Sequence, residues 1–136
     1  MSTPEDDAAA GHRRADELVR LVAKDGAAAD ALLAGLTDVR ELVFVGAGLT
    51  AIARTEGRQL PPAQRAQAST RQLRLGQLRD AQRGDPDGLR TWLRQAADEI
   101  LFLRSLQAAA DRAAQRRGAA ATATGSISTS KPATST

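Results

Sequence analysis

The segment from Leu42 to Ala53, LVFVGAGLTAIA, decides how the rest of this chain folds. At about 100° per residue, the apolar side chains of residues 39–52 surround a helical axis instead of lining one face. A helix that is apolar all round is buried on most sides, so this segment predicts the hub of a helical bundle. We expect the helix over residues 38–56, with Thr37 as its N-cap and Gly57 as its terminator.

Part of this segment has a second interpretation. Residues 43–51, VFVGAGLTA, resemble the Rossmann dinucleotide fingerprint, a strand followed by G-x-G-x-x-A. A working site of that kind needs a second strand that ends in an acid about 20 residues further on, to hold the ribose. The corresponding residues 60–67, LPPAQRAQ, contain no β-branched run and no acid. We therefore favour a buried helix in which Gly46 and Gly48 allow a close helix crossing, with a lone strand or hairpin as the remaining alternative.

Composition agrees with a helical protein. Of 136 residues, 29 are Ala and 16 are Leu, whereas aromatic residues make up 2%. This balance favours an all-α fold. The absence of Cys excludes disulfides, thiolate metal sites and a Cys nucleophile, and a single histidine, His12, excludes a His-rich metal site. We expect no catalytic residues, no metal, no cofactor and no small-molecule substrate.

The remaining helices are marked by their ends. Thr3 caps a first helix that Gly26 stops, and residues 27–36 form one or two further turns. Residues 61–84 form the next helix. Asp85 caps a last helix that runs to Arg117 before Gly118. The prediction is a single four-helix bundle-like domain over residues 1–117, with a long C-terminal helix, followed by a low-complexity, disordered tail over residues 118–136.

Charge is divided unevenly along the chain. Residues 1–56 hold 6 cations and 10 acids, whereas residues 57–117 hold 12 cations and 6 acids. Such a division indicates nucleic-acid contact, or attraction within one bundle or between copies. The candidate residues for binding a DNA or RNA backbone are Arg65, Arg71, Arg74, Arg79, Arg83, Arg90 and Arg94. A solvated or partner-facing basic surface is the alternative interpretation.

The last helix has the clearest apolar face, from Leu89 through Trp92 to Ala110, with arginines on the opposite side. Leu101 and Phe102 fall outside that face. They either bind a partner or are covered by a neighbouring helix. The overlong helix, the divided charge and the lack of catalytic groups predict a non-enzymatic interaction or assembly module, either self-associating or a subunit of a larger complex. We expect a cytoplasmic protein without a membrane segment, because no apolar run approaches the ~20 residues that a membrane span needs.

Overall fold

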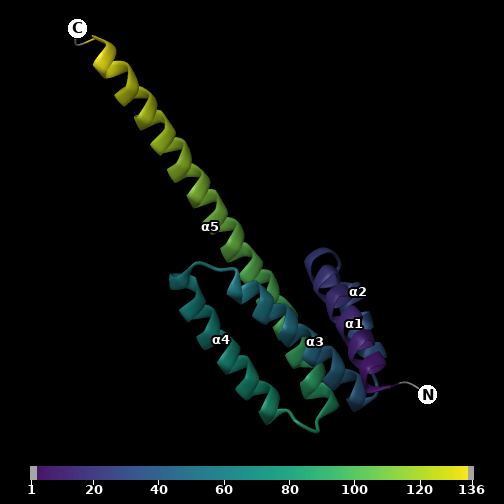
Figure 1. The fold of residues 1–136 in the computed structure, drawn as a ribbon. Coiled ribbons are helices and arrows are strands. Elements are labelled where there is room, and N and C mark those ends of the chain that lie inside the picture. The colour runs from purple at the N-terminus through teal and green to yellow at the C-terminus, as the bar shows by residue number, and fades with distance from the viewer. Residues whose placement is uncertain (1–2, 135–136) are drawn as a thin grey trace.

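The chain folds into helices alone over the part that the structure describes. The computed structural model describes the backbone of residues 3–134 and the side chains of residues 3–122. Within residues 3–134 it contains no strand and five helices, α1 (Pro4–Lys24), α2 (Gly26–Gly35), α3 (Val39–Arg58), α4 (Pro62–Ala81) and α5 (Pro86–Thr134). The predicted all-α, bundle-like fold is confirmed. In Figure 1, α1 and α2 lie on one side of α3 and α5, and α4 lies on the other side.

Local hydrogen bonds explain where the first helices begin. Thr3 caps α1 as predicted, since its hydroxyl accepts from the amide of Asp6 and the Asp6 carboxylate accepts from the amide of Thr3. Gly26 does not stop α1. It opens α2 instead, because the Asp25 side chain accepts from Ala28 N (3.1 Å) and so caps the second helix.

The cap of α3 also differs from the prediction. Asp38, not Thr37, is the N-cap, and its carboxylate accepts from Arg40 N at 2.9 Å. The helix ends at Arg58, one residue beyond the glycine that was expected to terminate it.

Helix α3 is the hub of the bundle, as predicted, and it packs against α1, α4 and α5. It is nevertheless not buried on all sides: Val39 and Val43 are 40% and 55% exposed. The buried side chains of α3 join those of its neighbours in one continuous core. Its largest fully buried side chains are Leu18, Leu42, Leu49, Leu60, Leu93, Ile100, Leu103, Val19 and Val45.

Gly46 and Gly48 of α3 lie at close helix contacts, which confirms their predicted role. A Cβ atom at Gly48 would lie 2.9 Å from His12 Cα and 3.0 Å from Ala15 Cβ of α1. A Cβ atom at Gly46 would lie 3.0 Å from the ring of Trp92 on α5. The stretch that resembles a dinucleotide fingerprint is therefore the interior of a helix, and its glycines face other helices.

Helix α4 and the C-terminal part of α5 contribute little to the core. Ala68 is the one buried residue of α4, all of whose residues are described. A turn with Gly84 at φ +87° then leads into α5, whose C-terminal part projects well beyond the other helices (Figure 1). This helix does not end before Gly118 as expected. It continues to Thr134, and the three alanines directly after Gly118 favour that continuation by their high helix propensity. Of the tail predicted to be disordered, residues 135–136 and the side chains of residues 123–134 lie outside the part described.

Gly76, in the interior of α4, provides a first stability test. A Cβ atom at this position would meet nothing within 4 Å. Replacing an exposed glycine inside a helix with alanine removes a conformational penalty, so Gly76→Ala should stabilise the fold by about 1 kcal/mol. Urea denaturation followed by circular dichroism measures the change, and a lower unfolding midpoint would contradict the open surroundings of Gly76.

Candidate partner-binding groove

Helices α3, α4 and α5 enclose an open groove of about 610 Å³. It exists because α4 stands off from α3 instead of burying an apolar face against it. The floor of this groove is apolar and is made by residues of all three helices: Leu49, Ala53, Ala68, Leu75, Trp92 and Ala96.

Trp92 connects the floor of the groove to α4. Its ring is buried, as the sequence predicted, and its indole Nε1 donates a hydrogen bond to the Leu75 carbonyl oxygen at 2.7 Å. The Arg79 guanidinium lies 5.8 Å from the centre of the same ring, within the range of a cation–π interaction. These contacts hold α4 beside α5 while the space toward α3 stays open.

The rim of the groove is basic. Arg54 and Arg58 lie one turn apart on α3, and neither forms an ion pair or hydrogen bond within the described residues. On α4, Arg65 donates to the Leu60 carbonyl oxygen at 2.7 Å, and Arg79 lies 3.7 Å from the Asp80 carboxylate. Asp80 is the single acid among the described lining residues, so the groove combines an apolar floor with a positively charged rim.

A second cluster, which we call the Arg71 clamp, joins α4 to α5. Arg71 Nε and Nη2 each donate to a carboxylate oxygen of Glu99 at 2.7 Å, and the guanidinium stacks 3.9 Å from the centre of the Phe102 ring. The Glu99 side chain is 8% exposed and that of Arg71 is 39% exposed. The hydrogen bond to Glu99 raises the pKa of Arg71 above its ordinary value, so this guanidinium is always charged.

The two residues proposed to bind a partner are half-buried in this chain. Leu101 packs against the core. Phe102 lies beneath the Arg71 guanidinium, so a side chain of the neighbouring helix α4 covers its ring. Their position outside the apolar face of α5 therefore has an explanation within one chain.

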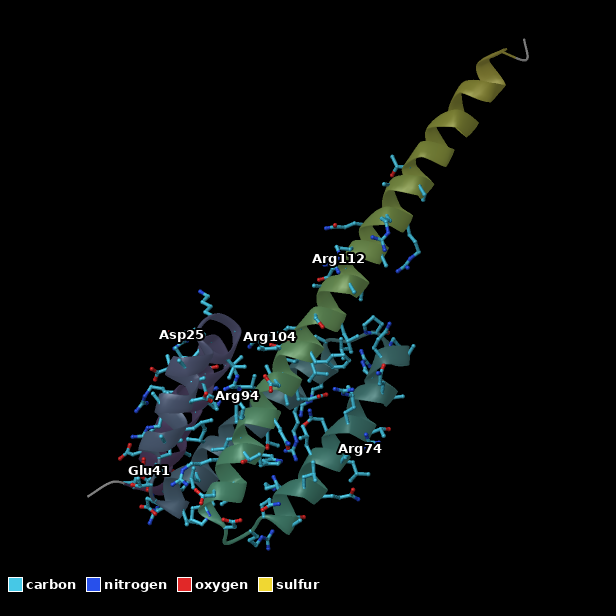
Figure 2. The ribbon with its side chains drawn as sticks, turned by 180° about the vertical axis from the view of Figure 1, so that it is seen from behind. Asp25, Glu41, Arg74, Arg94, Arg104 and Arg112 are labelled. Atoms are coloured by element: carbon cyan, nitrogen blue, oxygen red, sulfur yellow. The ribbon has the colours of Figure 1, made fainter. Side chains whose placement is uncertain are left out.

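The seven arginines proposed to bind nucleic acid do not form one surface. Arg65 and Arg79 line the groove, Arg71 belongs to the clamp, and the Arg83 guanidinium lies 3.2 Å from the Asp80 carboxylate. Arg74 has no ion pair or hydrogen bond within the described residues, and it lies on α4 (Figure 2).

Arg90 and Arg94 face the acidic half of the chain. Arg90 bonds to the Asp87 carboxylate (2.6 Å) and the Leu36 carbonyl oxygen (3.1 Å), and Arg94 pairs with Asp30 at 2.6 Å. Arg104 reaches Glu56 in the same way, at 2.9 Å. The divided charge is thus partly matched inside one bundle, which was one of the predicted alternatives.

Sequence reasoning missed Glu99, Gly11 and the unpaired Arg54 and Arg58 as functional or structural positions. The sequence contained a signal for Glu99 and for Gly11. Glu99 falls inside the apolar arc of its helix, which is unusual for an acid without a buried partner. Gly11 precedes the buried Ala15 by one helical turn, on the face that meets α3. The groove itself had no sequence signal, because it depends on how far α4 stands from α3.

Other kinds of site were also sought in the described residues. They contain no group of three or more His, Asp or Glu side chains arranged to hold a metal ion. None of their helices has both the length and the apolar character needed to cross a membrane. The chain is an all-α protein of the helical-bundle class, and comparisons with known protein families, curated proteins and solved structures found no match.

Proposed function

We propose that this protein is a non-enzymatic helical interaction module that self-associates through the projecting part of α5. The observation that carries the proposal is the length of α5. Its C-terminal part lies beyond the other helices (Figure 1). From residue 108 to residue 122, most of its side chains are exposed. Most of the stability of a helix in a protein comes from packing one of its faces, so a helix this far from its own bundle is suited to pair with another chain.

One face of the projecting part continues the core of the bundle. Leu103 is buried and Leu106 packs partly against the core, and the same three- and four-residue spacing leads on to Ala110 and Ala113. We call Leu106, Ala110 and Ala113, which follow the buried Leu103 on this face, the α5 seam. Arg112 lies on the opposite side of the helix, and Figure 2 places it on the projecting part. A seam of small apolar residues with charges opposite permits close approach of a second helix.

Light scattering over a dilution series tests self-association. At high concentration we expect a mass above the 14.3 kDa of the monomer, falling toward that value on dilution. Ala113→Glu puts a charge on the seam and should shift the equilibrium toward monomer by about tenfold, which corresponds to about 1.4 kcal/mol. Ala108→Glu adds the same charge to the opposite face and serves as the control, with no expected shift.

Two results would contradict this proposal. A monomer at every concentration would exclude self-association. Equal effects of Ala113→Glu and Ala108→Glu would show that the seam is not the contact.

Binding of a nucleic-acid backbone is the alternative function, and it receives less support. Of the seven arginines proposed for it, Arg74 alone lacks an ion pair, hydrogen bond or ring contact within the described residues. For the other six, a phosphate group would have to compete with a carboxylate, carbonyl or aromatic group that already holds the guanidinium.

A further inference from the structure

We propose that the groove between α3, α4 and α5 binds a short amphipathic helix with an acidic polar face, supplied by another protein. This inference rests on the proposed function in so far as both describe an interaction module. It does not require self-association, because the α5 seam and the groove share no residue.

The dimensions of the groove fit a helix. Its lining spans residues 49–58 on α3 and residues 65–80 on α4. At 1.5 Å per residue these walls are about 14 Å and about 22 Å long. A helix that docks through side chains at positions i, i+3 or i+4, and i+7 needs about 10 Å for its anchors. The groove therefore accommodates two to four turns of a partner helix.

Apolar surface that the fold leaves uncovered lies at the same place. Leu73 lines the groove and is 66% exposed, although it is a large hydrophobic side chain. It stands on the α4 wall, across from the floor residues Leu49 and Ala53 of α3. An apolar stripe on a docked helix would cover Leu73 and the floor together, which supplies the main driving force for binding.

The charge of the rim selects the occupant. The groove is lined by four basic side chains and one acidic side chain, Asp80. The basic ones are Arg54, Arg58, Arg65 and Arg79. The projecting part of α5 in a second copy is an unsuitable occupant, because its charged residues from 108 to 122 are one acid and three arginines. A helix that carries Glu or Asp beside its apolar stripe pairs with the rim instead.

A free hydrogen-bond donor adds a polar contact. Gln72 also lines the groove, and its buried Nε2 atom has no acceptor within the described residues. A rotation of the Gln72 side chain would bring this donor to the groove surface, where a carboxylate or carbonyl oxygen of the docked helix would accept from it. The unmet donor otherwise carries a desolvation cost.

Trp92 makes binding directly measurable. It is the only Trp in a chain without Tyr, and it forms part of the groove floor, so its fluorescence reports on the groove without a background from other Trp or Tyr residues. The probe is a synthetic 14-residue peptide free of Trp and Tyr, with Leu at positions 3, 6, 7 and 10 and mainly Glu and Ala elsewhere. The control peptide has Lys in place of each Glu. We expect a saturable change in Trp92 emission with the Glu peptide, weakened by added salt, and little change with the Lys peptide.

Two pairs of variants localise the binding. Gly76→Leu fills open space in the groove and should weaken binding by roughly tenfold or more, since the central apolar contacts carry most of the binding energy. Gly76→Ala changes the same position without filling the groove and should bind normally. Arg54→Gln with Arg58→Gln should weaken binding and reduce its salt dependence. Arg13→Gln with Arg20→Gln removes the same charge from exposed positions on α1 and is the matched control.

Several outcomes would overturn the proposal. One is the absence of a saturable signal with the Glu peptide, and another is equal binding of the Lys peptide. A third is unchanged binding by Gly76→Leu. A fourth is displacement of the peptide by stoichiometric dodecanoate, which would assign the groove to a small amphiphile. Light scattering on the same samples reports self-association separately, so either proposal can fail while the other stands.

Discussion

Arg71→Met should destabilise the fold by about 3 kcal/mol, the largest effect that we expect from a single polar side chain in this protein. Removing one partner of a buried ion pair leaves an uncompensated charge, which typically costs about 3–5 kcal/mol. Glu99 is the buried member, with a side chain 8% exposed, whereas Arg71 is 39% exposed. The expected value lies at the lower end because water enters where the guanidinium was.

The order of effects around the Arg71 clamp is a sharper test than the single value. Glu99→Leu should cost less than Arg71→Met, because the freed guanidinium already reaches solvent and still stacks on Phe102. The double variant Arg71→Met with Glu99→Leu should be nearly as stable as the parent protein, since an apolar pair replaces a desolvated ionic one. Urea denaturation of the four proteins completes this double-mutant cycle.

The cost of removing Arg71 is expected to depend on pH in a defined way. The hydrogen bond to Glu99 raises the pKa of Arg71, so the stabilisation linked to that shift is fully present below the ordinary pKa of arginine. It is lost only as the pH rises through the raised pKa. The cost of Arg71→Met should therefore stay constant between about pH 6 and about pH 9. A double variant as unstable as Arg71→Met alone would contradict the interpretation of the clamp as a compensated buried charge.

Gly11→Ala should destabilise the protein by about 2–3 kcal/mol, the typical cost of inserting a methyl group into a tightly packed contact. A Cβ atom at Gly11 would lie 2.6 Å from both the carbonyl carbon and the carbonyl oxygen of Phe44. Those atoms belong to the backbone of α3, so no side-chain rotation relieves the clash. The two helices would have to separate along the contact in which Gly48 also lies.

The sign of this effect distinguishes packing from helix propensity. Propensity alone predicts that alanine stabilises a helix relative to glycine at every interior position. We therefore expect Gly11→Ala and Gly76→Ala to shift the urea midpoint in opposite directions. If both variants were more stable than the parent, α1 and α3 would not be in the contact that the structure describes.

Local patterns were sufficient for part of this architecture. The helical nature of residues 42–53, the cap at Thr3 and the burial of Trp92 all follow from sequence spacing, since each depends on neighbours within a turn or two. Gly46 and Gly48 were also identifiable as points of close approach, because small residues inside a strongly apolar helix leave room for a neighbour. Prediction of the helix ends failed where two residues that can each start or end a helix are adjacent. Asp25 stands next to Gly26, and Asp38 stands next to Thr37.

The candidate site could be predicted far less well. The divided charge suggested nucleic-acid binding or a solvated or partner-facing basic surface. The fold instead distributes those side chains among a groove rim, an ion pair with a buried acid and contacts with the acidic half. Leu101 and Phe102 were singled out correctly as exceptions to the helix pattern, but which helix covers them depends on the position of α4. Because α4 has a single buried residue, its sequence shows no apolar face from which its distance to α3 and α5 could be predicted.

The sequence by itself determined that this chain forms helices, where most of them begin, and which residues lie in the hub, because these properties depend on short-range periodicity and capping. Only the tertiary structure decided that Gly11 meets Phe44, that Glu99 is neutralised by Arg71, and that α4 stands off to leave a basic-rimmed groove. The physical reason is that these features join residues on different helices, and the balance of packing and charge that sets contacts between helices has no periodic signature in the chain.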